Sequence, residues 1–197
     1  MDVAEGLAWT AMIVLALVLL AVGALCYAVA LYNGLVQVRH QVDQAWANIE
    51  VLLRQRHDEL PALIGAVTAY TTHERGLLEH VTALRAQASK VRAGGPERLA
   101  VEQALSRGVV RVLAVAEAQP ALRADPLFRD LQSRIAALET QIAQRRSFYN
   151  DAVTLNNVRR ESFPDRLFAP LAGLVPRPLF AIDASDRADV DIGARGG

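Results

Sequence analysis

Residues 7–31 read LAWTAMIVLALVLLAVGALCYAVAL, an apolar stretch without any Asp, Glu, Lys or Arg. As a helix, the stretch would be about 37 Å long at 1.5 Å per residue, which exceeds the roughly 30 Å hydrocarbon core of a bilayer. Trp9 near its start, and Tyr27 and Tyr32 near its end, are residue types that favour the two membrane interfaces. The stretch therefore predicts a transmembrane helix from which the rest of the chain extends.

Two processed forms of the N-terminus fit the sequence less well than an uncleaved span. A signal peptide begins with a basic region, whereas this chain begins MDVAEG and its apolar run is longer than a signal peptide needs. A lipoprotein has small residues directly before its cysteine, whereas the large Leu25 precedes Cys26. We interpret Cys26 as a small apolar residue within the span.

The orientation of the span is predicted from the Lys and Arg residues that flank it. None precedes the span, whereas Arg39, Arg54 and Arg56 follow it. The positive-inside rule then places the N-terminus outside and the long C-terminal part in the cytoplasm of a bacterial inner membrane. Arg39 is the basic residue nearest to the bilayer and marks the cytoplasmic interface.

The composition limits the class of partner and the redox chemistry. Lys and Arg together number 21, and so do Asp and Glu, so the chain has no net field that would attract nucleic acid. The single cysteine lies in the span, so the domain is predicted to have neither an intramolecular disulfide nor a cysteine zinc site. The roughly 160 residues outside the span suit one domain.

From residue 36 onward, apolar residues follow the three-and-four spacing of an amphipathic helix. This stripe comprises Val42, Ala45, Trp46, Ile49, Leu52, Leu53, Leu60, Leu63, Ile64, Val67, Tyr70, Leu77, Leu78, Val81 and Leu84. Pro61 interrupts the stripe, because proline has no N–H and collides with the carbonyl of His57. The helix either kinks at Pro61 or ends and restarts there. The stripe keeps its phase, which favours a helix kink.

Glycine and proline mark the ends of two further helices. A Gly-Gly-Pro break at residues 94–96 precedes a helix that ends by Pro120. Residues 119–126 are interpreted as a turn, and the Asp-Pro pair at its end opens the last long helix. This helix stops before Phe163. No alternating strand pattern of useful length occurs in this body of the chain.

These patterns predict an all-α fold in which a transmembrane helix continues into an antiparallel four-helix-type bundle with long helices, partly of coiled-coil type. The boundaries are an extracytoplasmic N-terminus at 1–5, the transmembrane helix at 6–35, the bundle at 36–163, and a Pro-rich extension with an acidic mobile tail at 164–197. The extension is expected to pack against the bundle or skim the bilayer as short helical turns. At most DVDI, residues 189–192, adds a short strand.

Two segments of the chain, residues 31–74 and 145–174, carry a set of recurring motifs: Tyr32-Asn33, Ala45-Trp46, an Arg-x-x-x-Leu-Pro turn that ends at Pro61, Tyr149-Asn150 and Phe163-Pro164. With these motifs, the two segments resemble the opening and closing segments of the bacterial LemA family. The resemblance implies a membrane anchor followed by an antiparallel four-helix-type bundle, and it implies no established catalytic activity. Proteins similar to this family occur beside membrane proteases and among factors associated with magnetosome membranes. The chain departs from the usual pattern at Leu155-Asn156, where Tyr-Asn is more typical.

Candidate catalytic patterns are weak. His73 and Glu74 begin like a metalloprotease helix, but Leu77 stands where the second metal ligand belongs. Glu50 and Arg54 are spaced as a surface ion pair. Neither a Gly-rich phosphate loop nor a G-x-S-x-G nucleophile motif occurs in the sequence. The chain is therefore predicted to be no enzyme and to bind no metal, cofactor or small-molecule substrate.

Five asparagines fall within predicted helices, where Asn is a poor helix former. They are Asn33, Asn48, Asn150, Asn156 and Asn157. One interpretation is hydrogen bonding between helices that fixes their register. The other is that Tyr32-Asn33 and Tyr149-Asn150, together with Trp46, mark surfaces that contact lipid headgroups or a partner. The sequence leaves both interpretations open.

The expected partners are the lipid bilayer, further copies of the chain and a membrane protein. Small residues in the span, Gly23, Ala24 and Ala28, allow close approach of two spans and support a homo-oligomer. The preferred function is a scaffold or adaptor at the cytoplasmic face. The alternatives are a membrane-remodelling or compartment-organising protein that acts by oligomeric assembly, and an accessory factor of a membrane protease or envelope-stress system.

Overall fold

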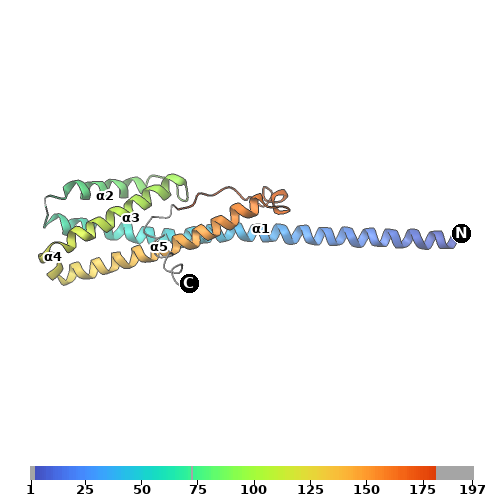
Figure 1. Ribbon diagram of the computed structural model, residues 1–197, viewed down its shortest axis with the longest axis horizontal. Coiled ribbons are helices and arrows are strands. Elements are labelled where there is room, and N and C mark those ends of the chain that lie inside the picture. The colour runs from blue at the N-terminus through green and yellow to red at the C-terminus, as the bar shows by residue number, and fades with distance from the viewer. Residues whose placement is uncertain (1–2, 72, 181–197) are drawn as a thin grey trace, which may run out of the picture. The chain divides into compact units, whose positions relative to one another are not determined.

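A computed structural model describes residues 3–71 and 73–180, and all regular elements in these ranges are helical (Figure 1). The elements are α1 (Val3–Thr68), α2 (Arg75–Ala88), α3 (Pro96–Glu117), α4 (Pro120–Ala124), α5 (Pro126–Glu161) and the 3-10 turn η1 (Asp165–Leu167). The prediction of an all-α fold is thereby confirmed. The predicted acidic tail and the short strand at residues 189–192 lie outside the described residues.

The first helix, α1, contains both the apolar stretch and the start of the bundle in 66 continuous residues. This confirms that the apolar helix continues into the bundle. Pro61 lies inside α1, and the helix runs on past it to Thr68.

The apolar stripe predicted one helix up to Leu84, and this prediction was wrong, because α1 already ends at Thr68. The described residues between α1 and α2, 69–71 and 73–74, are not helical, and the amides of Tyr70 and Thr71 both donate to the carbonyl of Val67. The aromatic and β-branched residues that follow Thr68 are poor helix formers, which favours an end at this point. Because α2 begins at Arg75 and continues the three-and-four spacing of apolar residues, the sequence pattern alone does not reveal that α1 ends at Thr68.

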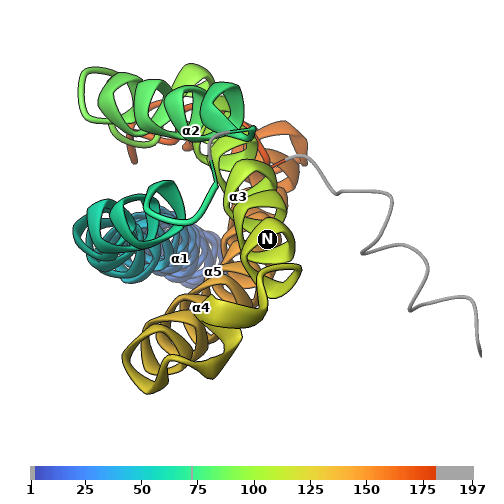
Figure 2. The same cartoon turned by 90° about the vertical axis from the view of Figure 1, so that its left-hand side faces the viewer.

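The chain divides into two compact units. Among the described residues, unit 1 comprises 3–41 and 155–176, and unit 2 comprises 42–71, 73–154 and 177–180. In unit 2, α2, α3 and α5 are arranged around α1 (Figure 2). Their main core contains Leu60, Leu63, Val67, Leu78, Val81, Leu84, Val101, Leu105, Val109, Val112, Ile135 and neighbouring apolar residues.

In unit 1, a folded segment after α5 packs on α1; we call it the C-terminal hook (residues 162–176). Leu35 of α1 is fully buried and forms a small core with Ala169, Ala172 and Leu174 of the hook. The hook turns at Gly173, which has φ +71°, a conformation that favours glycine. A Cβ atom at this position would lie 2.8 Å from Nη1 of Arg39, so glycine also permits the close approach of this side chain.

Gly108 of α3 brings α3 against α2, and its replacement by alanine should destabilise unit 2. A Cβ atom at position 108 would lie 2.7 Å from Cγ2 of Val81, which is fully buried and has few alternative rotamers. Overpacking costs about 1–3 kcal/mol and exceeds the gain in helix propensity of about 0.5–1 kcal/mol. Gly108→Ala should therefore lower the free energy of unfolding by on the order of 1 kcal/mol.

Gly65→Ala is the matched control, because a Cβ at this exposed helical position would meet no atom within 4 Å. It should raise the free energy of unfolding by about 0.5–1 kcal/mol. The unfolding of both glycine variants is measured on the full chain in mild detergent by the fluorescence of Trp46, after Trp9→Phe removes the other tryptophan. Equal stabilities of the two variants would contradict the close packing of α3 on α2.

Candidate functional site

The apolar part of α1 is the first candidate interaction surface. Within the described residues, α1 is the one helix that is long enough and apolar enough to cross a membrane, by length and composition. Every side chain from Trp9 to Tyr27 is exposed, and so is Tyr32. Arg39, the fourth residue predicted at the interface, donates from Nη1 to the carbonyl oxygen of Ala172, 3.1 Å away, and its place at the membrane interface stays a prediction.

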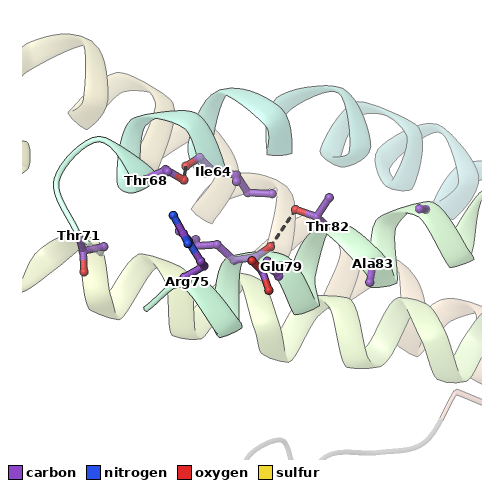
Figure 3. Close-up of a pocket in the computed structure, with 9 residues that line it drawn as sticks. Ile64, Thr68, Thr71, Arg75, Glu79, Thr82 and Ala83 are labelled. Carbon is purple, nitrogen blue, oxygen red and sulfur yellow. Dashed lines mark hydrogen bonds between the residues drawn. The ribbon is translucent and has the colours of Figure 1, made fainter. Parts of the chain in front are cut away.

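A groove of about 460 Å³ lies in unit 2 between the end of α1 and α2 (Figure 3). Its lining comprises Ile64, Thr68, Thr71, Arg75, Leu78, Glu79, Thr82, Ala83 and Ala86. The hydroxyls of Thr68 and Thr82 donate to the carbonyls of Ile64 and Leu78, at 2.7 and 2.8 Å. Their donors are thus used within their own helices, and the groove suits an apolar group.

A buried ionic cluster lies among α1, α3 and α5 in unit 2. Arg56 is fully buried, and its Nη1 lies 3.0 Å from Oε1 of Glu139 and 2.5 Å from the hydroxyl of Ser106. Its Nη2 pairs with the buried carboxylate of Glu102. Arg98, one turn before Glu102 on α3, lies 2.6 Å from the same carboxylate. Two arginines and two glutamates therefore balance their charges inside the bundle.

The carboxyl of Glu102 stays ionised because its partners outweigh its burial. Burial alone raises its pKa, whereas the hydrogen bond from His57, 3.3 Å away, and the positive charges of Arg56 and Arg98 lower it. The net pKa lies below the ordinary value of 4.5. The cluster is therefore a structural ion network whose stability depends on the charge of Glu102.

Because the folded pKa of Glu102 is depressed, unit 2 should lose stability as the pH falls below 4.5. Between the folded and unfolded pKa values, the unfolded chain binds more protons than the folded chain, so acid favours unfolding. Glutamine does not titrate, so Glu102→Gln removes this proton uptake on unfolding. The free energy of unfolding of the variant should therefore fall less steeply than that of the wild type as the pH is lowered through this range. Thermal unfolding followed by Trp46 fluorescence at a series of pH values measures both slopes.

Glu50→Gln is the control for the pH experiment, because Glu50 pairs with Arg54 at the surface, 3.8 Å away. It should keep the slope of the wild type. The predicted surface pair of these two residues is confirmed. A Glu102→Gln slope equal to that of the wild type would show that the folded bundle does not lower the pKa of Glu102.

An aromatic cluster of Trp46, Tyr149 and Phe180 joins α1, α5 and the C-terminal segment of unit 2. The ring centroids of Trp46 and Phe180 are 6.3 Å apart in a stacked arrangement, and Tyr149 meets both rings edge-on. Burial raises the pKa of the Tyr149 hydroxyl, which donates to the carbonyl of Pro178. Asn150 donates from Nδ2 to the Phe180 carbonyl and accepts from the Phe180 amide, at 3.1 and 2.9 Å.

The other asparagines singled out in the sequence fall into two groups. Asn33 and Asn48 are exposed on α1. Asn156 is buried in unit 1 and donates from Nδ2 to the carbonyl of Val175 and to the side-chain oxygen of Asn157. Asn150 and Asn156 thus bind the chain that follows α5. Contacts of these residues with a partner stay a prediction.

The buried ionic cluster was missed by the sequence analysis, although the helical spacing carries a signal. Arg56 occupies the position between Leu53 and Leu60 where the three-and-four spacing calls for an apolar residue. Glu102 likewise follows Leu99 by three residues on the apolar stripe of α3. Opposite charges on the core stripes of two helices indicate a buried pair, because a lone buried charge is too costly.

Comparisons with known proteins identify the family of this chain and several curated relatives. A family model described as the LemA family matches residues 45–193. The magnetosome protein MamQ 2 of Paramagnetospirillum magneticum is 21% identical over 167 residues, which covers 72% of this chain and 61% of that protein. The magnetosome protein MamQ of Magnetospirillum gryphiswaldense is 19% identical with the same coverage. The chain therefore spans about three fifths of the length of these curated relatives.

Proposed function

The chain belongs to the LemA family, and on this premise we propose that it is a non-enzymatic, single-pass membrane protein whose helical bundle serves as a scaffold or adaptor. The proposal rests mainly on α1. One helix carries an exposed apolar stretch and then contributes Leu60, Leu63 and Val67 to the core of unit 2. The helix that enters the membrane is thus also an integral part of the bundle.

The exposure of the apolar stretch favours a bilayer as its surroundings. Soluble monomers rarely leave contiguous apolar patches larger than a few hundred Å² in water, at a cost of about 25 cal/mol per Å². From Trp9 to Tyr27 no side chain is covered by the rest of the described chain. In the proposed orientation the N-terminus lies outside, and the bundle after Arg39 lies in the cytoplasm of a bacterial inner membrane.

The groove between α1 and α2 supports a role in binding another protein. It accepts an apolar side chain, while Arg75 and Glu79 in its lining can pair with charges next to that side chain. The exposed apolar residues Val110 and Phe148 add further contact surface to unit 2. A membrane-protein partner bound in this way would be held at the cytoplasmic face by the span.

The adaptor proposal is tested by photo-crosslinking in the native membrane. A benzoylphenylalanine probe replaces Ala83, which lines the groove, or Gln55, an exposed residue of α1 outside it. The probe at position 83 should yield an adduct of one defined mass that co-purifies in stoichiometric amount, and the probe at position 55 should not. Equal adducts from both positions, or none from position 83, would contradict an adaptor that uses this groove.

A second candidate function is the organisation of a membrane compartment by assembly of many copies. It is supported by the similarity to proteins named as magnetosome proteins and by the small residues of the span. The full chain in liposomes should then form regular arrays in electron micrographs. Gly23→Leu is the control, since a side chain at Gly23 meets nothing within 4 Å in the single chain but would keep two spans apart. Arrays that persist unchanged in this variant would exclude assembly through the span.

A further inference from the structure

The C-terminal hook presents apolar side chains to its surroundings although it is a folded segment. Phe163, Leu167 and Leu171 are 74%, 59% and 72% exposed. They lie in and around η1 and its following turn, in unit 1, the same unit as the apolar stretch of α1. Three large apolar side chains exposed within nine residues form a patch that a water-facing surface does not require.

The hook is fixed on α1 by specific contacts, so its level along the helix is defined. Leu35 is buried against Ala169 and Ala172, and Arg39 donates to the carbonyl of Ala172. A side chain at Gly34 would meet Nη2 of Arg159, 3.4 Å away, which brings the end of α5 to the same turn of α1. The hook and the end of α5 therefore pack on α1 between residues 34 and 39.

This level coincides with the end of the apolar stretch. Leu35 follows Leu31, the last residue of the stretch, by four residues, which is about 6 Å along a helix. Side chains of interfacial segments are buried about 5–10 Å into the boundary between headgroups and acyl chains. A hook that packs within about one turn of the end of a membrane span can reach this boundary.

Of the two charged side chains of the hook, Asp165 is paired within the protein and Arg166 is exposed. The buried carboxylate of Asp165 pairs with Arg159 of α5, and the neighbouring Arg160 lies 2.7 Å from Glu161. These pairs lower the cost of bringing the segment to a region of low dielectric constant. The carbonyl oxygens of Ala172 and Val175 accept hydrogen bonds from Arg39 and Asn156, which reduces the number of backbone groups that depend on water.

We propose that the C-terminal hook is a second membrane contact, which inserts Phe163, Leu167 and Leu171 into the interface of the bilayer that the span crosses. This inference rests on the proposed membrane span. A lipid surface is favoured over a second copy of the chain because the patch lies beside the turn of α1 where the apolar stretch ends. A bilayer that surrounds the stretch would therefore also reach the patch. The hook would thereby set the position of the end of α5 at the membrane.

The test measures the depth of a fluorescent label on the full chain in liposomes. The chain has a single cysteine, Cys26, so a label there reports on the span itself. In a Cys26→Ala background, Leu171→Cys or Leu167→Cys carries the label on the hook, and Gln87→Cys carries it on an exposed face of α2 as the aqueous control. Lipids with a spin label near the headgroup or deep in the acyl chain serve as quenchers.

The shallow quencher should quench both hook labels several-fold more than the label at position 87, while the label at Cys26, inside the span, is quenched by the lipid quenchers. Quenching of Cys26 together with hook labels that behave like position 87 would overturn the inference and leave the span intact. Hook labels shielded from aqueous iodide but not quenched by lipid would show that a second copy covers the patch, which also overturns it. If Cys26 escapes both lipid quenchers, the membrane span itself fails, and the inference fails with it.

Discussion

Replacing Arg56 by alanine should lower the free energy of unfolding of unit 2 by about 3–5 kcal/mol. The substitution leaves the buried carboxylate of Glu102 without its closest partner and removes the hydrogen bonds that Arg56 donates to Glu139 and Ser106. An uncompensated buried charge costs far more than the net contribution of an intact pair. Thermal and denaturant unfolding of the full chain in detergent, followed by Trp46 fluorescence, measures the change.

Two further variants make the Arg56 experiment specific. Arg54→Ala removes a neighbouring arginine whose side chain is 76% exposed and should change stability by less than about 0.5 kcal/mol. The double variant Arg56→Met, Glu102→Leu replaces both buried charges and should recover much of the loss, because an apolar pair can substitute for a buried ion pair. An Arg56→Ala variant as stable as Arg54→Ala would contradict the burial of the ionic cluster.

Arginines at Leu15 and Leu19 should move most of the protein out of the membrane fraction. Each arginine at the centre of a span costs about 2.5–3.5 kcal/mol of insertion free energy, and the two lie one turn apart on the same face. Both leucines are exposed, so the substitutions disturb no packing within the chain. Alkaline carbonate extraction of cell membranes measures the fraction that remains inserted.

The matched control for the span is Leu15→Ile together with Leu19→Ile, which keeps both sites apolar and should stay in the membrane fraction. Trp46 fluorescence of the arginine variant should match that of the wild type, since Trp46 lies in unit 2. If the arginine variant resisted carbonate extraction as the wild type does, the apolar stretch would not be the element that holds the chain in the membrane.

The helix starts that depend on local chemistry could be predicted from the sequence. Proline is pre-organised for the first helical turn, and both α3 and α5 begin at the predicted prolines, Pro96 and Pro126. Likewise, α5 ends at Glu161, before the predicted stop at Phe163. The segment predicted as a turn at residues 119–126 instead contains α4, a helix of five residues that is too short to show a periodic pattern.

The features that depend on distant contacts could not be predicted in the same way. The sequence spacing places Arg56 and Glu102 on core stripes, but only the folded bundle shows that they face one another across 46 residues. The partners of Asn150 and Asn156 are backbone groups of Phe180 and Val175, which carry no sequence signal of their own. A backbone hydrogen bond of this kind depends on where the chain returns after α5.

The position at which the hook packs along α1 also depends on distant contacts. Its Pro-rich composition predicted short helical turns, and the structure contains one such turn, η1. The contact of Ala169 and Ala172 with Leu35 depends on small side chains that permit close approach to α1 and do not stand out in the sequence. The exposed apolar residues of the hook could therefore be read from the sequence, whereas their depth relative to the span could not.

The central claim, that α1 crosses a membrane before it enters the bundle, is tested most directly by proteolysis of the full chain in sealed liposomes. Proteinase K added outside should leave one protected peptide that contains residues 7–31, identified by mass spectrometry. Dissolving the liposomes in detergent should abolish this protection. Digestion of residues 7–31 in intact liposomes would contradict a membrane-spanning α1 and the scaffold proposal that depends on it.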